Sequence, residues 1–295
     1  MSARRAGRGA AFSAPGLAKP GAGAYLPAMF CDIDLCRRCG ACVAECPFEV
    51  VVPDGEGFPA LRRAARKMCI GCGHCVAVCP VGALTLPEMP VTPEVGPGLC
   101  PPVPGGARPD PARAELFLAS RRSVRTYRPE PLDRATLEHL LAVAAHAPSA
   151  HNRQPVRWIV SFSPGRTRAL AGLVVEHMAA RGLFPGLRRH WAAGEDRVLR
   201  GAPHVAVATA PLDGLNPAED CCAAAAYLEL AAHARGLGAC WAGFLMEAAR
   251  EYPPLAEALG VAPGHGVFAA IILGKVRFRY RRVPPRRAPR VDWLE

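Results

Sequence analysis

A cysteine run that occurs twice constrains this chain more than any other feature. The spacing C-x2-C-x2-C-x3-C-P begins at Cys36 and again at Cys69. In such a run the first three thiolates bind irons of one cubane cluster, and the fourth cysteine, which precedes proline, binds the other cluster. The repeat therefore predicts two [4Fe–4S] clusters. By the same rule, one cluster has the ligands Cys36, Cys39, Cys42 and Cys79, and the other has Cys69, Cys72, Cys75 and Cys46.

Zinc is the alternative for a cysteine-rich segment. A zinc site holds one tetrahedral ion, commonly between two separated C-x2-C pairs or between cysteines and histidines. Eight cysteines in two identical runs exceed that requirement, so the pattern favours iron–sulfur clusters. The total of 13 cysteines is odd, and no apolar secretory segment precedes the first run. These features argue against a disulfide framework and predict a reducing, cytoplasmic location.

Composition divides the chain at a proline-rich segment. Residues 87–111 contain nine prolines, which cannot sustain a helix or a strand ladder, so they predict an extended linker. Residues 25–86, which hold both cysteine runs, are then a two-cluster iron–sulfur domain, and residues 112–295 are a second domain. Residues 1–24 are rich in Arg, Ala, Gly and Pro and contain no acidic residue, which predicts a disordered leader.

Residues 112–295 show alternating helix and strand patterns. Asp133 is the predicted N-cap of a helix with one apolar face, and Gly236 is the expected C-terminal glycine of a long alanine-rich helix that begins with Asn216 as cap and Pro217. The apolar segments 205–209 and 267–273 predict central strands, and 156–162 predicts a further strand. The uncharged apolar segments are too short to span a membrane.

Common catalytic motifs are absent from the sequence of this second domain. It has no G-x-G-x-x-G, P-loop, G-x-S-x-G or H-E-x-x-H pattern, and so lacks the sequence basis of Rossmann dehydrogenases, kinases, α/β-hydrolases and zinc proteases. Four other segments occur in a fixed order, namely R-R-S-V-R at 121–125, P-S-A-H-N-R-Q-P at 148–155, G-L-G-A-C-W-A-G at 236–243 and P-P-R-R at 284–287. In this order they resemble the FMN-dependent nitroreductase family, over residues 115–293. Chains of that family with an N-terminal two-cluster ferredoxin domain are the best match.

The resemblance implies residues that bind FMN. Arg121 and Ser123, with an arginine from the C-terminal end, would hold the phosphate and ribityl chain, because a dianion needs fixed cations. Arg125, the predicted catalytic residue, would lie near flavin N1 and the C2 carbonyl, where reduction adds negative charge. Gly243 would bring a backbone N–H close to N5, and the loop at 148–152 would reach the ring from the partner subunit. The full set is Arg121, Arg122, Ser123, Arg125, Pro148, Ser149, Ala150, Asn152, Gly243, Arg286 and Arg287.

The resemblance also implies an α+β fold and an activity. A small ferredoxin-like iron–sulfur domain would precede a mixed sheet with helices on both faces, in a homodimer. The chain would be an FMN-dependent oxidoreductase, in which a low-potential donor such as a ferredoxin reduces the clusters and FMN reduces a small electrophile. The sequence does not choose among nitroaromatic, quinone and enone-like acceptors, or between ferredoxin and NAD(P)H as donor. The alternative is a non-catalytic electron carrier or redox sensor that relays electrons between protein partners.

The formal net charge of +11 raises the question of nucleic-acid binding. Of the 36 basic residues only Lys19, Lys67 and Lys275 are lysine, a bias that fits a GC-rich coding sequence. Few aromatic residues are interleaved with the basic ones, outside Phe278 and Tyr280, and stacking platforms for bases are therefore missing. Charge and pattern together argue against a nucleic-acid partner.

Overall fold

The computed structural model describes residues 29–63, 65–87, 89 and 98–294. The predicted leader at 1–24 and residues 88 and 90–97 of the proline-rich segment lie outside the described residues. The chain divides into two compact units. One comprises Met1–Arg108 with His151–Arg153, and the other comprises Pro109–Ala150 with Gln154–Glu295. The domain limits drawn from the sequence at 86 and 111 stay predictions.

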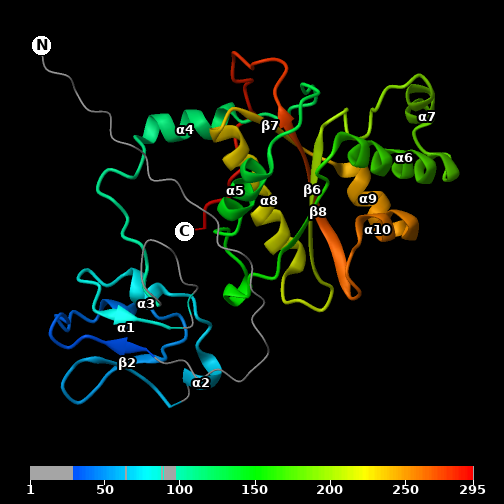
Figure 1. The fold of residues 1–295 in the computed structure, drawn as a ribbon. Helices are drawn as coiled ribbons and strands as arrows, with labels where there is room; N and C mark the ends of the chain where they lie inside the picture. The colour runs from blue at the N-terminus through cyan, green and yellow to red at the C-terminus, as the bar shows by residue number, and fades with distance from the viewer. Residues whose placement is uncertain (1–28, 64, 88, 90–97, 295) are drawn as a thin grey trace, which may run out of the picture. The chain divides into compact units, whose positions relative to one another are not determined.

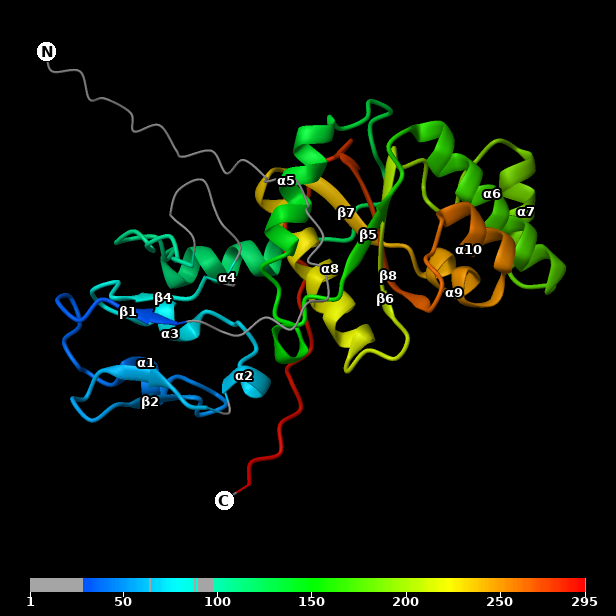
Figure 2. The same ribbon diagram turned by 60° about the horizontal axis from the view of Figure 1, so that its bottom comes forward.

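The first unit is built from a short strand–helix–strand motif that occurs twice (Figure 2). Two antiparallel pairs link the copies, because the first strand of each copy pairs with the last strand of the other. Phe30 lies opposite Thr85 in one pair, and Val51 lies opposite Leu61 in the other. The elements are β1 (Phe30–Cys31), α1 (Ala41–Ala44), β2 (Val51–Pro53), β3 (Pro59–Leu61), α2 (Ala65–Met68), α3 (His74–Ala77) and β4 (Leu84–Thr85).

The sequence repeat is also a repeat of backbone conformation. Three pairs of residues separated by 33 positions have left-handed φ angles between 50° and 73°, namely Arg38 and Gly71, Gly40 and Gly73, and Glu49 and Gly82. Gly40 and Gly73 precede α1 and α3 and lie inside the second C-x2-C gap of each run. Because only glycine adopts this conformation without strain, both cysteine loops depend on these two positions.

The second unit is organised around a four-stranded sheet in the order β5-β6-β8-β7. All three pairs of named strands are antiparallel, and an isolated bridge between Ser123 and Ala239 adds a parallel contact at β7. The central pair is the longest and runs from His204 opposite Leu273 to Pro211 opposite His265. The strands are β5 (Arg157–Val160), β6 (His204–Pro211), β7 (Leu237–Trp241) and β8 (His265–Lys275). The predicted central strands at 205–209 and 267–273 are confirmed.

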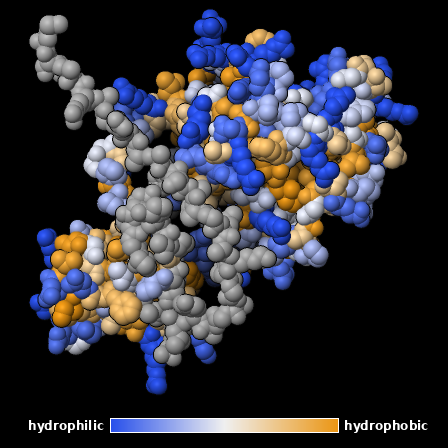
Figure 3. All heavy atoms as spheres, in the orientation of Figure 1, coloured by the Kyte–Doolittle hydropathy of each residue, from blue (hydrophilic) through white to orange (hydrophobic). Residues whose placement is uncertain are grey.

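Helices cover both faces of this sheet, as the fold class predicted from the sequence requires (Figure 1). Alternate residues of β6 divide between two cores: Val205 and Val207 pack with one helix layer, and Ala206 and Ala208 pack with the other. Hydrophilic side chains, interspersed with hydrophobic ones, lie over α7 and the outer side of α6 (Figure 3). The first layer consists of α6 (Pro164–Ala180), α9 (Gly243–Glu251) and α10 (Pro253–Leu259), and α7 (Pro185–Ala192) lies outside it. The other layer consists of α5 (Arg134–Ala144) and α8 (Pro217–Ala234). The unit begins with α4 (Pro111–Ser120).

The predicted helix ends are confirmed with one correction. Asp133 caps α5, because its carboxylate accepts hydrogen bonds from the Thr136 N–H at 2.6 Å and the Thr136 hydroxyl at 2.9 Å. Gly236 follows α8 with a left-handed φ of 68°. Asn216 stands at the N-cap position of α8, but its side chain makes no capping hydrogen bond there. Among the described residues, no helix has the length and apolar character needed to cross a bilayer.

His204 is a fully buried polar side chain at the start of the central strand. Its Nε2 accepts a hydrogen bond from the Leu132 N–H at 2.8 Å, so the proton is on Nδ1, which donates to the Ser161 carbonyl at 3.0 Å. A protonated Nε2 would oppose the Leu132 N–H. Burial lowers the pKa of His204, which keeps the ring neutral and ties β6 to the segments before α5 and after β5.

We expect the stability of the second unit to depend on His204 and on pH. A folded-state pKa below the unfolded value of about 6.5 means that the unfolded chain binds a proton that the folded site refuses. The contribution of His204 is therefore complete above that pH and is lost as the pH falls, by at most ~1.4 kcal/mol per pH unit. His204→Gln should cost about 1–3 kcal/mol at pH 7.5 and less at pH 5.5. Urea titrations followed by tryptophan fluorescence measure this, because all four tryptophans belong to the second unit. An equal cost at both pH values would contradict the assignment.

Candidate functional site

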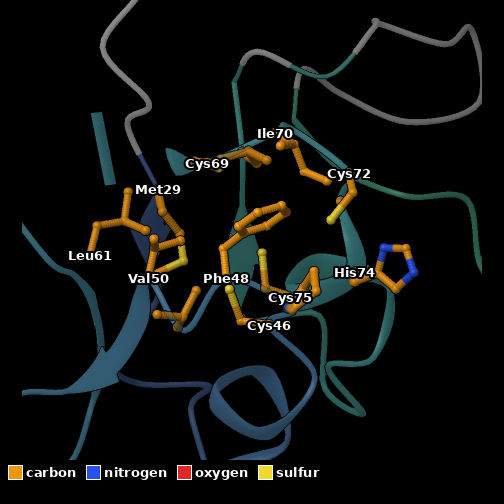
Figure 4. Close-up of a pocket in the computed structure, with 14 residues that line it drawn as sticks. Met29, Cys46, Phe48, Val50, Leu61, Cys69, Ile70, Cys72, His74 and Cys75 are labelled. Atoms are coloured by element: carbon orange, nitrogen blue, oxygen red, sulfur yellow. The ribbon is translucent and has the colours of Figure 1, made fainter. Parts of the chain in front are cut away.

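The fold of the first unit assembles one set of four cysteines in a single cavity (Figure 4). Cys69, Cys72 and Cys75 come from the second run, and Cys46 comes from the first. The side chains of Cys46, Cys72 and Cys75 point into the cavity. The rest of the lining is almost wholly apolar and includes Phe48. This is the ligand set that the sequence rule assigned to one cluster.

The complementary set of cysteines lines a second cavity of the first unit. Cys36, Cys39 and Cys42 of the first run meet Cys79 of the second run there, beside Arg37 and Arg38. The Arg38 N–H donates to Cys36 Sγ at 3.5 Å, and the Ala83 N–H donates to Cys79 Sγ at 3.3 Å. Hydrogen bonds of this kind to ligand sulfurs raise the reduction potential of a cluster. Each cavity therefore combines three thiols of one run with the fourth thiol of the other.

The donor set of each cavity fits a cubane cluster. Four thiols and a mostly apolar lining suit an iron–sulfur cluster, in which every thiolate binds a different iron. Around a single ion the four ligands would instead converge on one point. Within the described part of the chain, no group of three or more His, Cys, Asp or Glu side chains is placed to share one metal ion.

In the second unit, two of the predicted flavin residues line one cavity of about 370 Å³. Arg125 contributes its exposed side chain, and Gly243 contributes the first turn of α9. The amide of a first-turn residue has no acceptor within its helix, so the Gly243 N–H is available to a ligand. Cys240, Trp241 and Phe244 supply sulfur and aromatic surface. A cation, a free amide and an apolar wall fit a planar cofactor that gains negative charge on reduction.

Close backbone packing places Arg125 at this cavity. The Val124 N–H donates to the Ala239 carbonyl at 2.9 Å, so the segment before Arg125 lies along β7. A Cβ atom at Gly238 would come within 2.7 Å of the Val124 side chain, and one at Gly274 within 2.9 Å of the Tyr127 ring. Glycine at both positions is therefore required for this approach.

Tyr127 anchors the same segment. Its hydroxyl donates to the Val124 carbonyl at 2.6 Å, and burial raises the pKa of the phenol far above its ordinary value. The hydroxyl therefore stays protonated and keeps Val124, the neighbour of Arg125, in place.

Arg121 is held by a carboxylate. Its Nη1 lies 3.3 Å from Oε1 of Glu229 on α8, whose side chain is only 8% exposed. The other oxygen of Glu229 accepts from Trp241 Nε1 at 3.0 Å. Glu229 thus connects the first arginine of the R-x-S-x-R segment to an aromatic residue that lines the cavity. The sequence analysis missed Glu229, because a glutamate within an alanine-rich helix carries no local signal for such a role.

The polar groups of the predicted 148–152 loop have partners within the chain. The Ala150 N–H donates to buried Asp220 at 2.9 Å, and Ser149 Oγ accepts from the Gln154 N–H at 2.9 Å. The Asn152 amide donates to the carbonyls of Ile70 and Gly71 at 3.4 and 3.2 Å, and His151–Arg153 belongs to the first unit. None of the predicted residues of this loop is among those that line the cavity with Arg125 and Gly243.

The remaining predicted residues also lie outside that cavity. Arg122 is half-buried, whereas Arg286 and Arg287 are exposed. Ser123 lies on the backbone bridge to β7, and its carbonyl accepts from the Tyr280 hydroxyl at 3.4 Å. Their roles toward FMN stay predictions.

Two arginines that the sequence analysis did not single out line the same cavity. Arg197 and Arg200 lie in the segment before β6, and both line the cavity together with Arg125 and Gly243. Two arginines three residues apart in a polar segment look the same in the sequence whether they line a site or lie in a solvent-exposed turn. The sequence alone therefore does not identify them.

Comparison with known proteins agrees with this geometry. Residues 118–275 match the model of the nitroreductase family, and residues 35–84 match that of the 4Fe-4S dicluster domain. The match to the first model covers more than half of the chain. The chain therefore belongs to the nitroreductase family, and the segment that contains the eight cysteines of the two runs is a 4Fe-4S dicluster domain.

Individual relatives resemble separate parts of the chain. Nitroreductase NfnB of Mycolicibacterium smegmatis is 31% identical over 145 residues, which cover 38% of this chain and 62% of that protein. An NADH dehydrogenase of Thermus thermophilus is 46% identical over 57 residues, which cover 19% of this chain and 28% of that protein. The matches thus span less than two thirds of either relative.

A solved structure resembles the second unit in fold. A nitroreductase with bound FMN from Bacteroides fragilis superposes with a TM-score of 0.54 at 21% identity, over 61% of this chain and 98% of its own. The fold class predicted from the sequence, an iron–sulfur domain followed by a nitroreductase-like domain, is confirmed.

Pairs of cysteine substitutions test whether the clusters share the two runs. If Cys46 and Cys69 bind the same cluster, Cys46→Ala with Cys69→Ala should remove one cluster and leave about four irons per chain. Cys46→Ala with Cys36→Ala should remove both clusters. Iron and sulfide analysis of anaerobically purified protein measures both. The reverse result would show that each run holds its own cluster.

Proposed function

We propose that this chain is an FMN-dependent oxidoreductase that receives electrons through two [4Fe–4S] clusters and reduces a small electrophile. The observation that carries the proposal is the occurrence, in one chain, of two four-cysteine cavities and a nitroreductase-family unit whose cavity combines Arg125 with Gly243. A low-potential one-electron donor such as a ferredoxin supplies the electrons, in a reducing, cytoplasmic compartment.

The clusters and FMN have complementary tasks in this scheme. Clusters transfer electrons singly, and FMN, when bound, collects two electrons and delivers them as a pair. The chain's own contribution is electrostatic. Arg125 holds a fixed positive charge at the cavity, and Gly243, in the first turn of α9, lines the same space. Preorganised charge of this kind stabilises negative charge that develops during reaction.

A homodimer completes the proposed site. Helix α4 has no buried residue within the single chain, and Leu116 and Leu118 are 61% and 56% exposed. An apolar helix surface of this kind favours burial against a second copy. In the dimer, the 148–152 loop of one subunit would approach the flavin of the other.

Removal of the clusters tests the electron path. Cys39→Ser combined with Cys72→Ser disrupts one ligand in each cysteine set. We expect this variant to retain FMN but to lose reduction of the flavin by a chemically reduced ferredoxin, followed as bleaching of flavin absorbance under anaerobic conditions. Equal flavin reduction by NADH or NADPH in the variant and the native protein, at rates matching those with ferredoxin, would show that the clusters are not the obligatory source.

Potentiometry tests the role of Arg125. Arg125→Ala should lower the flavin potential, since the reduced anionic ring loses a charge-assisted hydrogen bond of ~1.5–3 kcal/mol. At ~30 mV per 1.4 kcal/mol for a two-electron couple, the shift is on the order of 30–65 mV. Arg128→Ala is the matched control, because Arg128 is exposed and lines no cavity described above. A native potential in Arg125→Ala with FMN fully bound would show that Arg125 is an ordinary surface arginine.

A further inference from the structure

The flavin cavity adjoins a second, open cavity of about 470 Å³. Arg197, Arg200 and Phe244 line both cavities and therefore lie at the boundary between them. None of the residues expected to hold the FMN phosphate, namely Arg121, Ser123, Arg286 and Arg287, lines either cavity. Arg197 and Arg200 are not among the residues predicted to hold the cofactor, although both line its proposed cavity.

The segment that carries these arginines is rigidly built. The Asp196 carboxylate accepts hydrogen bonds from the N–H groups of Val198, Leu199 and Gly201 at 2.9, 2.8 and 3.1 Å. Leu199 is fully buried and anchors the turn in the core. Arg200 has a left-handed φ of 61°, a conformation that an arginine keeps only where its surroundings impose it. The backbone at Arg200 is therefore held in place before any ligand binds.

The second cavity has an aromatic wall next to these cations. The rings of Phe184 and Phe244 are 5.0 Å apart in an edge-to-face arrangement, and both line the cavity. Phe184 is 51% exposed, although phenylalanine usually avoids water. An aromatic or conjugated ligand in the cavity would cover this ring.

Among the described residues, Arg125 and Arg200 have no ion-pair partner, and of these two only Arg200 also lines the second cavity. Arg197 is paired with Glu195 at 2.7 Å, and Glu195 also contacts His190, which lines the second cavity. Glu247 also lines the first cavity and adds one negative charge there. Within the part of the chain that the structure describes, no hydrogen bond or ion pair engages the Arg200 guanidinium. One unpaired, half-buried cation suits a monoanion such as a carboxylate better than a dianionic phosphate.

We propose that the second cavity binds the electron acceptor and that Arg200 selects an aromatic or conjugated acceptor carrying a carboxylate. The ring would pack against Phe184 and Phe244, and the carboxylate would accept bidentate hydrogen bonds from Arg200. The reducible group would then face the first cavity. This inference rests on the proposed function, because it takes the first cavity as the flavin site. Arg200 acts by binding and orientation, and Asp196 is a positioning residue for it.

Calorimetry with non-reducible ligands tests the charge selection. Benzoate and benzamide have nearly the same shape and differ in charge, so their dissociation constants for the oxidised holoprotein isolate the contribution of the carboxylate. We expect tighter binding of benzoate. Arg200→Gln should weaken benzoate binding roughly 10- to 100-fold and leave benzamide binding and FMN content unchanged. Arg188→Gln on α7 is the matched control, because Arg188 is an exposed arginine that lines neither cavity.

Three results would overturn the proposal. The first is equal affinity of the native protein for benzoate and benzamide. The second is loss of FMN from Arg200→Gln, which would assign the arginine to the cofactor phosphate. The third is an Arg200→Gln variant that binds benzoate and NADH as tightly as the native protein does but binds NADPH more weakly. That result would assign the arginine to the additional phosphate of NADPH. Absence of FMN from the native protein would instead contradict the proposed function, and the benzoate and benzamide titrations of the flavin-free chain would still decide the charge selection.

Discussion

The pairing of β8 with both β6 and β7 positions the main segments that line the candidate cavity of the second unit. Through β6, the ladder fixes the start of the strand at His204 and hence the preceding turn with Arg197 and Arg200. Through β7, which pairs Trp241 with Ile271, it fixes the strand end that leads into Gly243. The cavity therefore forms from segments that are distant in sequence, namely the turn before β6, the end of β7 and the first turn of α9. A slip of one residue would exchange the two faces of the strand and dismantle the cavity.

Duplication imposes a comparable constraint on the first unit. Because the first strand of each copy pairs with the last strand of the other, the end of each cysteine run is drawn toward the opposite run. The cavities reflect this exchange, since each takes its fourth cysteine from the other copy. The copies differ at two strained positions: Arg38 and Glu49 have the left-handed conformation that Gly71 and Gly82 adopt freely. The Arg38 guanidinium contacts the Phe58 ring and the Glu56 carbonyl, and these contacts help to offset the strain.

Local chemistry was predictable from the sequence, and long-range placement was not. The cysteine spacing, the Asp133 cap and the apolar strands depend on neighbours in the chain, so their patterns are visible in the sequence. Asn216 shows the limit even of local rules, because its side chain makes no capping bond. Arg200 and Glu229 obtain their roles only from the sheet order and from helix packing across more than 40 intervening residues. The resemblance to a family supplied Arg125 and Gly243, whereas residues outside the family pattern required the structure.

The distribution of charge explains how so basic a chain can have a selective cavity. The net charge of +11 is a property of composition, yet several arginines near the candidate sites are neutralised individually. Arg121 faces Glu229, and Arg197 faces Glu195. Arg125 and Arg200 lack such partners within the described residues, and both line the same cavity. A carboxylate beside an arginine fixes its position but cancels its attraction for anions at a distance. An anionic cofactor or acceptor is therefore attracted most strongly to the two unpaired arginines. The paired arginines instead stabilise the structure around the cavity.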